Sequence, residues 1–194
     1  MKFTVLVLAL MVLPAIAQAS AVVYTIDPNH THPMFEADHF GISTWRGLFK
    51  KTTGTITLDT KAQRGTVDVA IEIASIDFGH DKLNDTAAHS DNPGMFEPTR
   101  YPVATYQGTL GGFVDGAPTT VDGSLTLHGV TRPVALKIGS FKCIADHPLI
   151  HREVCGADAS GTLDRSDFGI DVGKQYGFKM EVALHIQVEA IKTK

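Results

Sequence analysis

Histidines are the residues of this sequence best suited to chemistry. His30 and His32 are two positions apart, so their side chains share a face if the segment is a strand. With His39, they would offer imidazole ligands to a divalent metal, as in a metal-dependent or redox enzyme. The Asp-Pro-Asn sequence at 27–29 is a turn signal, however, and a histidine beside a turn can instead bond to its backbone. The structural role is favoured, and an enzyme using these three histidines is the alternative.

Cys143 and Cys155 form an even pair with no cysteine left over. In an oxidising compartment such a pair favours a disulfide. Closing a loop of this size stabilises the folded protein by roughly 3 kcal/mol. The fourfold spacing of Cys143, His147, His151 and Cys155 would also place four metal ligands on one face of a helix. Pro148 interrupts that helix, so the sequence favours the disulfide over the metal site.

Catalytic motifs are missing from the sequence. It has no Gly-x-Ser-x-Gly nucleophile elbow, no phosphate-binding glycine loop, no His-Glu-x-x-His and no Cys-x-x-Cys-His. We therefore expect a protein that is not an enzyme, that has no catalytic residues and that needs no metal or cofactor.

Alternation of apolar with polar or small residues marks the elements that would position these side chains. It is strict at 67–74 and at 180–189, where the apolar residues recur every second position. This period predicts antiparallel strands with one buried face and one wet face. Weaker copies predict further strands, at residues 22–26, 32–37, 54–58, 104–110, 124–127, 134–138 and 157–163.

Turn signals separate these segments. They include Asp-Gly at 115–116 and 122–123, His-Gly at 128–129 and Thr-Arg-Pro at 131–133. The spacing predicts an all-β barrel or sandwich of about eight strands. Helix is scarce, with a short helix expected from Asp81 to about Ser90 and a single turn at 38–41. Without repeats or linkers, residues 20–194 form one domain.

Composition and the N-terminus limit the class of protein. The chain has 194 residues, 43% apolar and 20% charged, with a net charge of −4, which is typical of a folded domain and argues against nucleic acid. Residues 1–19 read as a signal peptide: Lys2, an apolar run over 3–16, then Ala-Gln-Ala. The run is shorter than the roughly 20 residues of a membrane span, so an anchor is the weaker alternative. We expect a cleaved, soluble, exported product.

Aromatic residues accompany this barrel-like pattern. An eight-stranded barrel is either filled by side chains or holds one small ligand, in an apolar cavity with a few polar groups at its mouth. Strands of about ten residues would make such a cavity roughly 33 Å long. The expected cavity residues are inward strand positions and aromatics that close the mouth: Phe35, Phe40, Trp45, Phe49, Val69, Ile71, Phe78, Phe96, Leu125, Leu127, Phe168, Val182, Leu184 and Ile186. His39 and Arg46 are candidate contacts to a ligand headgroup.

Several short motifs occur in order along the chain. They are Tyr24-x-Ile-Asp-x-x-His-Thr31 followed by Phe35 and His-Phe-Gly-Ile-Ser at 39–43, Trp45-Arg-Gly-x-Phe49, Ser-Ile-Asp at 75–77, Phe96-x-x-x-Arg-Tyr-Pro102, the long segment 123–134, and Arg-Ser-Asp-Phe-Gly at 165–169. In this order the chain resembles the YceI-like family of bacterial exported proteins over nearly its whole mature length.

That resemblance implies an extended antiparallel eight-stranded β-barrel of lipocalin type, with a long apolar cavity that holds a polyisoprenoid or similar lipid. It also implies a periplasmic location, and members of the family are often homodimers. The chain departs from the family pattern in a stretched segment before His89, in Ser90 where an apolar residue is usual, and in the Cys143–Cys155 loop.

The expected function is therefore binding of a long isoprenoid lipid, of polyprenyl or quinone type, for carriage, storage or sensing. Burial contributes about 0.8 kcal/mol per methylene group, so binding needs no reactive residue. We expect no nucleic acid partner and no integral membrane span. A purely structural or adhesive module is a third possibility, and it predicts neither metal nor extractable lipid.

Overall fold

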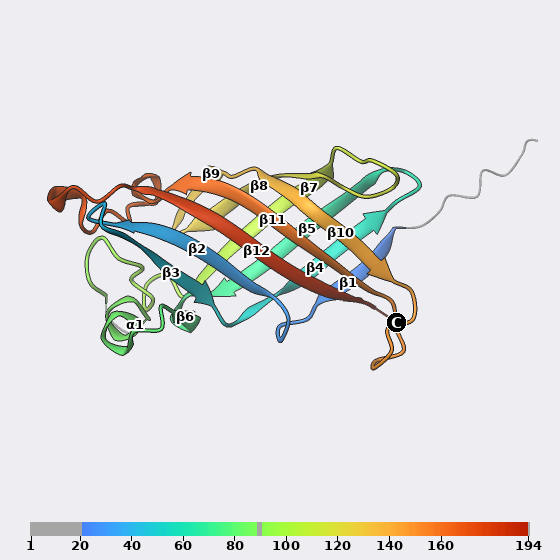
Figure 1. Ribbon diagram of the computed structural model, residues 1–194, viewed down its shortest axis with the longest axis horizontal. Helices are drawn as coiled ribbons and strands as arrows, with labels where there is room; N and C mark the ends of the chain where they lie inside the picture. Colours follow the sequence, from blue (N-terminus) through green and yellow to red (C-terminus); the bar gives the residue numbers. More distant parts are fainter. Residues whose placement is uncertain (1–20, 89–90, 194) are drawn as a thin grey trace, which may run out of the picture.

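Strands make up most of the computed structural model, which describes residues 21–88 and 91–193. The expected signal peptide, residues 1–19, lies outside the described residues, as do His89 and Ser90. Eight antiparallel strands form a closed barrel, as the sequence and the family resemblance predict (Figure 1). In barrel order they are β1 (Val22–Ile26), β4 (Thr52–Asp59), β5 (Arg64–Glu72), β7 (Val103–Gly111), β8 (Thr120–Leu127), β10 (Leu136–Ile144), β11 (Val154–Asp164) and β12 (Glu181–Lys192), and β12 pairs with β1 to close the ring.

Four further strands complete the sheet: β2 (His32–His39), β3 (Ser43–Phe49), β6 (Ile76–Asp77) and β9 (Val130–Pro133). β2 lies along the first half of β12, from Val182 to Gln187, and β1 lies along its last residues. β3 and β6 then extend the same wall beyond β2. The 12 residues of β12 span about 40 Å, so the barrel is long enough for an elongated ligand.

A side chain bridges the break between β1 and β2. Thr31 is buried, and its hydroxyl donates to the Glu189 carbonyl at 3.2 Å and accepts from the Glu189 amide at 3.1 Å. The Asp27 amide donates to the same carbonyl at 2.9 Å. Since these bonds replace the missing ladder, two separate strands continue one wall of the barrel beside β12.

Helix α1 (Asp81–Ala88) covers one end of the barrel, and the sequence predicted it with a slightly longer span. The Asp77 carboxylate anchors its first turns, because it accepts from the Gly79 amide at 2.8 Å and the Asn84 amide group at 2.9 Å. With Lys50 3.2 Å away, these donors lower the pKa of Asp77 to about 2. No helix within the described ranges is both long and apolar enough to cross a lipid bilayer.

The disulfide between Cys143 and Cys155 confirms the predicted bridge. The two cysteines face each other as a cross-strand pair of β10 and β11. A metal site at this place would need the same two sulfur atoms, so the bridge excludes that alternative. His147 and His151 lie in the connection between the two strands, and His151 is exposed, 3.5 Å from Asp146.

Three local predictions were wrong. No strand was predicted between residues 37 and 54, yet Trp45 and Phe49 both belong to β3. The alternation of β3 is hidden because its third inward position is Gly47, where a Cβ would overlap the ring of Phe35. The Asp-Gly pair at 122–123 lies inside β8 and does not form a turn. Finally, 131–133 belong to β9, and the expected strand 134–138 is displaced to β10, which begins at Leu136.

Candidate functional site

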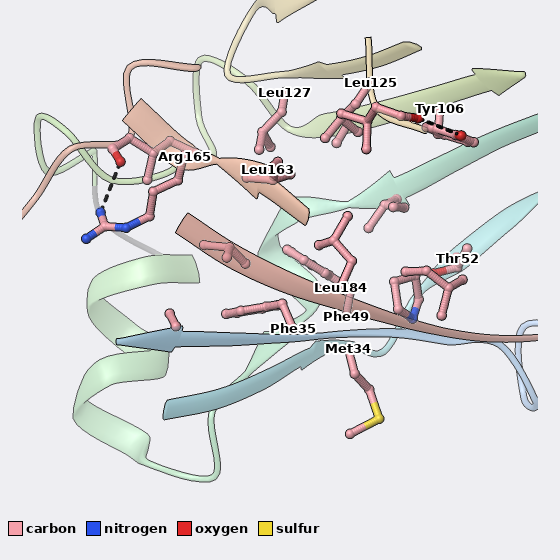
Figure 2. Close-up of a pocket in the computed structure, with 18 of the residues that line it drawn as sticks. Met34, Phe35, Phe49, Thr52, Tyr106, Leu125, Leu127, Leu163, Arg165 and Leu184 are labelled. Carbon is pink, nitrogen blue, oxygen red and sulfur yellow. Dashed lines mark hydrogen bonds between the residues drawn. The ribbon is translucent and has the colours of Figure 1, made fainter. Parts of the chain in front are cut away.

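A cavity of about 740 Å³ runs inside the barrel, within the usual size range of ligand sites. Figure 2 shows Leu125 and Leu127 on one wall and Leu184 on the facing wall, while Met34 turns its side chain away from the interior. The apolar side chains of the wall come from six strands: Ile56, Val67, Val69, Ile71, Leu125, Leu127, Leu136, Leu163, Val182, Leu184, Ile186 and Val188.

The barrel is hollow along this wall. Val69, Leu125 and Leu184 point inward, yet each is only partly buried. In a filled barrel such positions would pack against one another and lose their remaining accessible surface. The inward register predicted for Val69, Ile71, Val182, Leu184 and Ile186 is the observed one, and the alternate residue His185 is exposed on the outer face.

One end of the cavity is closed by buried apolar side chains. Ile26, Leu110, Pro118 and Ile138 line it and are all buried. The disulfide and the connection from β10 to β11 lie at this same end, since β11 begins there at Val154. We call this the closed end.

The other end of the cavity opens to solvent, and we call it the mouth end. The exposed residues that line the cavity there are Phe40, His80, Lys82, Asn92 and Tyr176. They come from the turn between β2 and β3, from the region of α1, and from the loops between β11 and β12. Figure 1 shows these three segments at one end of the barrel, opposite the connection between β10 and β11.

Aromatic rings border the mouth. The His39 ring lies 5.0 Å from Phe40, 5.5 Å from Phe178 and 5.6 Å from Trp45, measured between centroids in edge-to-face geometry. Phe40 and Phe178 are 4.3 Å apart. Edge-to-face pairs contribute about 0.5–1.5 kcal/mol each beyond burial, so these rings hold the entrance in a defined shape.

A second group of rings lies deeper, under α1. Phe35 lies 5.8 Å from Phe49 and 5.5 Å from Phe78, and Phe49 lies 6.1 Å from Phe96. Gly47 permits this arrangement because the Phe35 ring occupies the space that any larger side chain would need. These rings connect the aromatic mouth to the aliphatic wall.

Few polar groups line the interior. The Tyr106 hydroxyl donates to the Val134 carbonyl at 2.9 Å, and burial raises the pKa of Tyr106 to about 12, so it is neutral at pH 7. The hydroxyl of Thr52 is buried without a hydrogen-bond partner among the described residues. The middle of the cavity therefore offers hydroxyl groups and no charge to a ligand.

Arg165 is a partly buried cation that lines the mouth end beside the exposed Lys82, and it was not predicted. It lines the cavity in the 3-10 helix η2 (Arg165–Phe168), and Figure 2 shows its side chain at the edge of the pocket. Its guanidinium donates to the carbonyls of Ile170 at 3.0 Å and Val172 at 2.9 Å. Burial lowers the pKa of Arg165, but a guanidinium keeps its charge at neutral pH. Its place directly after a strand was the available signal, obscured by the acidic residues around it.

Arg46 and Phe168 are corrections to the expected site. Arg46 lies on the outer face of β3, because it alternates with the inward Trp45, and its side chain pairs with Glu36 at 2.8 Å. Phe168 is 1% exposed and packs in the core cluster without lining the cavity, since η2 turns it away under β9. His39 and all the other expected cavity residues do line the cavity.

The three histidines of the metal alternative are not gathered at one point. His30 lies in an exposed turn, 2.8 Å from Asp27, whereas His39 belongs to the aromatic mouth. Within the described residues, the group close enough to share an ion is Cys143, Glu153 and Cys155, and its sulfur atoms form the disulfide. The geometry thus favours an apolar binding site over a metal centre.

A family model described as the YceI-like domain matches residues 24–190. The protein YceI of Shigella flexneri is 34% identical over 184 residues, an alignment that covers 91% of this chain and 90% of that protein. A UPF0312 protein of Pseudomonas putida is 32% identical over 181 residues, with the same coverage of 91% and 90%.

Solved structures share the fold. BcnA of Burkholderia cenocepacia superposes with a TM-score of 0.65 at 21% identity, covering 85% of this chain and 99% of its own. A polyisoprenoid binding domain from Saccharophagus degradans superposes with a TM-score of 0.63 at 16% identity, covering 89% and 99%. At these identities the likeness concerns the architecture of the barrel.

Proposed function

The chain belongs to the YceI-like family, and from this premise we propose that it is an exported periplasmic protein that holds a long isoprenoid lipid inside its barrel. The family is one of binding proteins, and a neighbour of the same fold is a polyisoprenoid binding domain. The observation that carries the proposal is the apolar cavity, closed at one end and open at the other. The ligand is of polyprenyl or quinone type, and no reaction is catalysed.

The wall of the cavity supports an apolar chain as ligand. Each methylene group that leaves water for the wall contributes about 0.8 kcal/mol, and the barrel is long enough for many of them. A wall of Val, Ile and Leu offers no directional contacts, so it selects ligands by girth and length.

The mouth end supports a polar headgroup. His39 and Arg165 line the cavity close to the opening, and the guanidinium is a cation with donors suited to a carbonyl or an anionic oxygen. We therefore place the apolar tail toward the closed end and the headgroup at the mouth. A homodimer is part of the proposal, because the resemblance to the family includes it.

Mass spectrometry of a solvent extract tests the proposal. Protein purified from the periplasm without detergent is extracted with organic solvent, and we expect a long isoprenoid lipid in amounts close to one per chain. The stripped protein should melt at a lower temperature than the loaded one, because a ligand that binds only the folded state stabilises it. An extract without lipid, together with an unchanged melting temperature, would contradict the proposal. Metal analysis of the same sample tests the alternative, a metal-dependent or redox enzyme.

A further inference from the structure

Exposed apolar side chains surround the opening of the cavity. Ile42 is 84% exposed and Phe40 50% exposed in the turn between β2 and β3, and Tyr176 is 67% exposed in the loop before β12. We call residues 40–42 and 173–179 the mouth rim. Single exposed apolar residues are ordinary, but several gathered at one opening form a patch that water solvates poorly.

The two segments of the mouth rim are fixed to each other. The Asp38 carboxylate accepts from the Gly41 amide at 3.0 Å and from the Lys179 amide at 3.2 Å. The rings of Phe40 and Phe178 pack at 4.3 Å across the same junction. Phe40 has a φ of 58°, a conformation that few residues other than glycine adopt. The rim is therefore a defined surface that holds its apolar side chains in solvent.

We propose that the mouth rim docks on the surface of a lipid bilayer, with Ile42 and Tyr176 inserted at the boundary between headgroups and acyl chains. This inference rests on the proposed function, because a lipid that enters the cavity must leave a membrane. The apolar surface is continuous from rim to cavity, since Phe40 and Tyr176 belong to both. A docked rim would let the isoprenoid chain pass between bilayer and barrel without crossing water. Tyrosine suits the place because its ring is apolar and its hydroxyl polar.

Charges around the rim show which force drives docking. Lys82, Lys174 and Lys179 are exposed there, but Asp81 and Asp171 are exposed beside them. Because exposed charges of both signs are present, attraction to anionic headgroups is weak and apolar insertion dominates. Zwitterionic phosphatidylcholine vesicles should therefore be sufficient, and binding should change little with salt concentration.

The closed end provides a matched control. Leu149, in the connection between β10 and β11, is 83% exposed, nearly the same as Ile42. Neither residue lines the cavity. Ile42→Asp and Leu149→Asp thus make the same chemical change at opposite ends of the barrel, and neither should alter folding or the lipid already held.

Flotation of the stripped mature protein with phosphatidylcholine vesicles tests the proposal. We expect Ile42→Asp to weaken vesicle binding by about tenfold or more, which corresponds to about 1.4 kcal/mol, while Leu149→Asp leaves it unchanged. The single tryptophan, Trp45, lines the mouth, so its fluorescence should shift to the blue on docking of the wild type and of Leu149→Asp only.

Three results with vesicles would overturn the proposal: no binding of the wild type, a loss with Leu149→Asp equal to that with Ile42→Asp, or binding that disappears in high salt. A rim that instead joins two copies of this chain would also overturn it, and would appear as a mass change in light scattering with Ile42→Asp. Co-purified lipid, measured in the same variants, separates this outcome from a failure of the proposed function, since an empty barrel in the wild type would refute that function itself.

Discussion

The closed end and the mouth end of the barrel differ in regularity and in exposure to solvent. At the closed end the strands are regular, the lining residues Ile26, Leu110 and Ile138 are buried, and a disulfide joins β10 to β11. At the mouth end the chain runs through turns and 3-10 helices, and aromatic rings meet edge to face around exposed residues. Under the proposed function, the closed end and the wall would keep water from the ligand, whereas the mouth end would control how a ligand enters and leaves.

A charge introduced into the cavity wall, midway between the two ends, should have the largest effect on lipid retention and stability. We expect Leu184→Asp, on the inner face of β12, to abolish lipid retention or to lower the free energy of unfolding by about 3 kcal/mol, because an unpaired carboxylate in an apolar cavity is costly. His185→Asp, on the outer face of the same strand, should do neither. Urea unfolding and lipid extraction measure both variants. Equal behaviour of the two would mean that the register of β12 is wrong by one residue.

Loss of the disulfide should affect stability more than ligand choice. Replacing Cys143 and Cys155 by serine opens a bridge with a sequence separation of 12, which is worth about 2–3 kcal/mol in unfolding free energy. The set of extracted lipids should stay the same, because the mouth end is untouched. Thermal unfolding and mass spectrometry provide the two measurements. Two free thiols in the unreduced wild type would remove the basis of this prediction.

Removing an aromatic ring from the mouth should change the rate at which lipid is released. Phe178→Ala removes the ring contacts with Phe40 and His39, and we expect lipid release to become about fivefold faster, as for a loss of about 1 kcal/mol. Transfer of a fluorescent isoprenoid analogue to acceptor vesicles measures the rate. Phe141→Ala, which removes a ring of the cavity lining near the closed end, is the control and should leave the release rate unchanged. A similar acceleration in both variants would show that the two ends do not differ in this way.

The smallest expected effect is on the pH dependence of folding stability, and it arises in the turn between β1 and β2. The hydrogen bond with Asp27 raises the pKa of His30, and the same bond lowers the pKa of Asp27. The raised histidine pKa adds stability below its ordinary value of 6.5, which is lost as pH rises through the folded value. The lowered aspartate pKa adds stability above 3.8, which is lost as pH falls through the folded value.

His30→Gln should therefore flatten the pH dependence of stability in both ranges, with little change in lipid binding. Urea unfolding over a pH series provides the measurement, with proton NMR titration of His30 in the wild type as a check. A His30 resonance that titrates at the ordinary value would contradict the prediction.

Strands with complete alternation were predicted correctly from the sequence, whereas strands interrupted by an inward glycine were not. β12 carries a complete alternation, so its inward residues were predicted from period alone. In β3 the inward Gly47 hides the same pattern, because Phe35 fills the missing volume from another strand. Gly123 looks like a turn residue, yet it lies within β8 because the Tyr106 ring packs over it. In both cases a ring from the neighbouring strand fills the space above a glycine. Such a contact between strands can be seen only in the structure, because it leaves no periodic pattern in the sequence.

The mouth was predicted in composition and not in detail. The aromatic residues and His39 were expected there, but Arg46 was chosen in place of Arg165. Arg46 is next to Trp45 in sequence and on the opposite face of the strand in space, whereas Arg165 reaches the cavity through a loop whose path no periodicity describes.

A crystal structure of the protein purified without removal of its lipid tests the central claim most directly. We predict continuous elongated density inside the barrel, from near Ile138 at the closed end to His39 and Arg165 at the mouth end. An interior packed with side chains along its whole length, with no elongated cavity, would contradict the claim that this barrel holds a lipid.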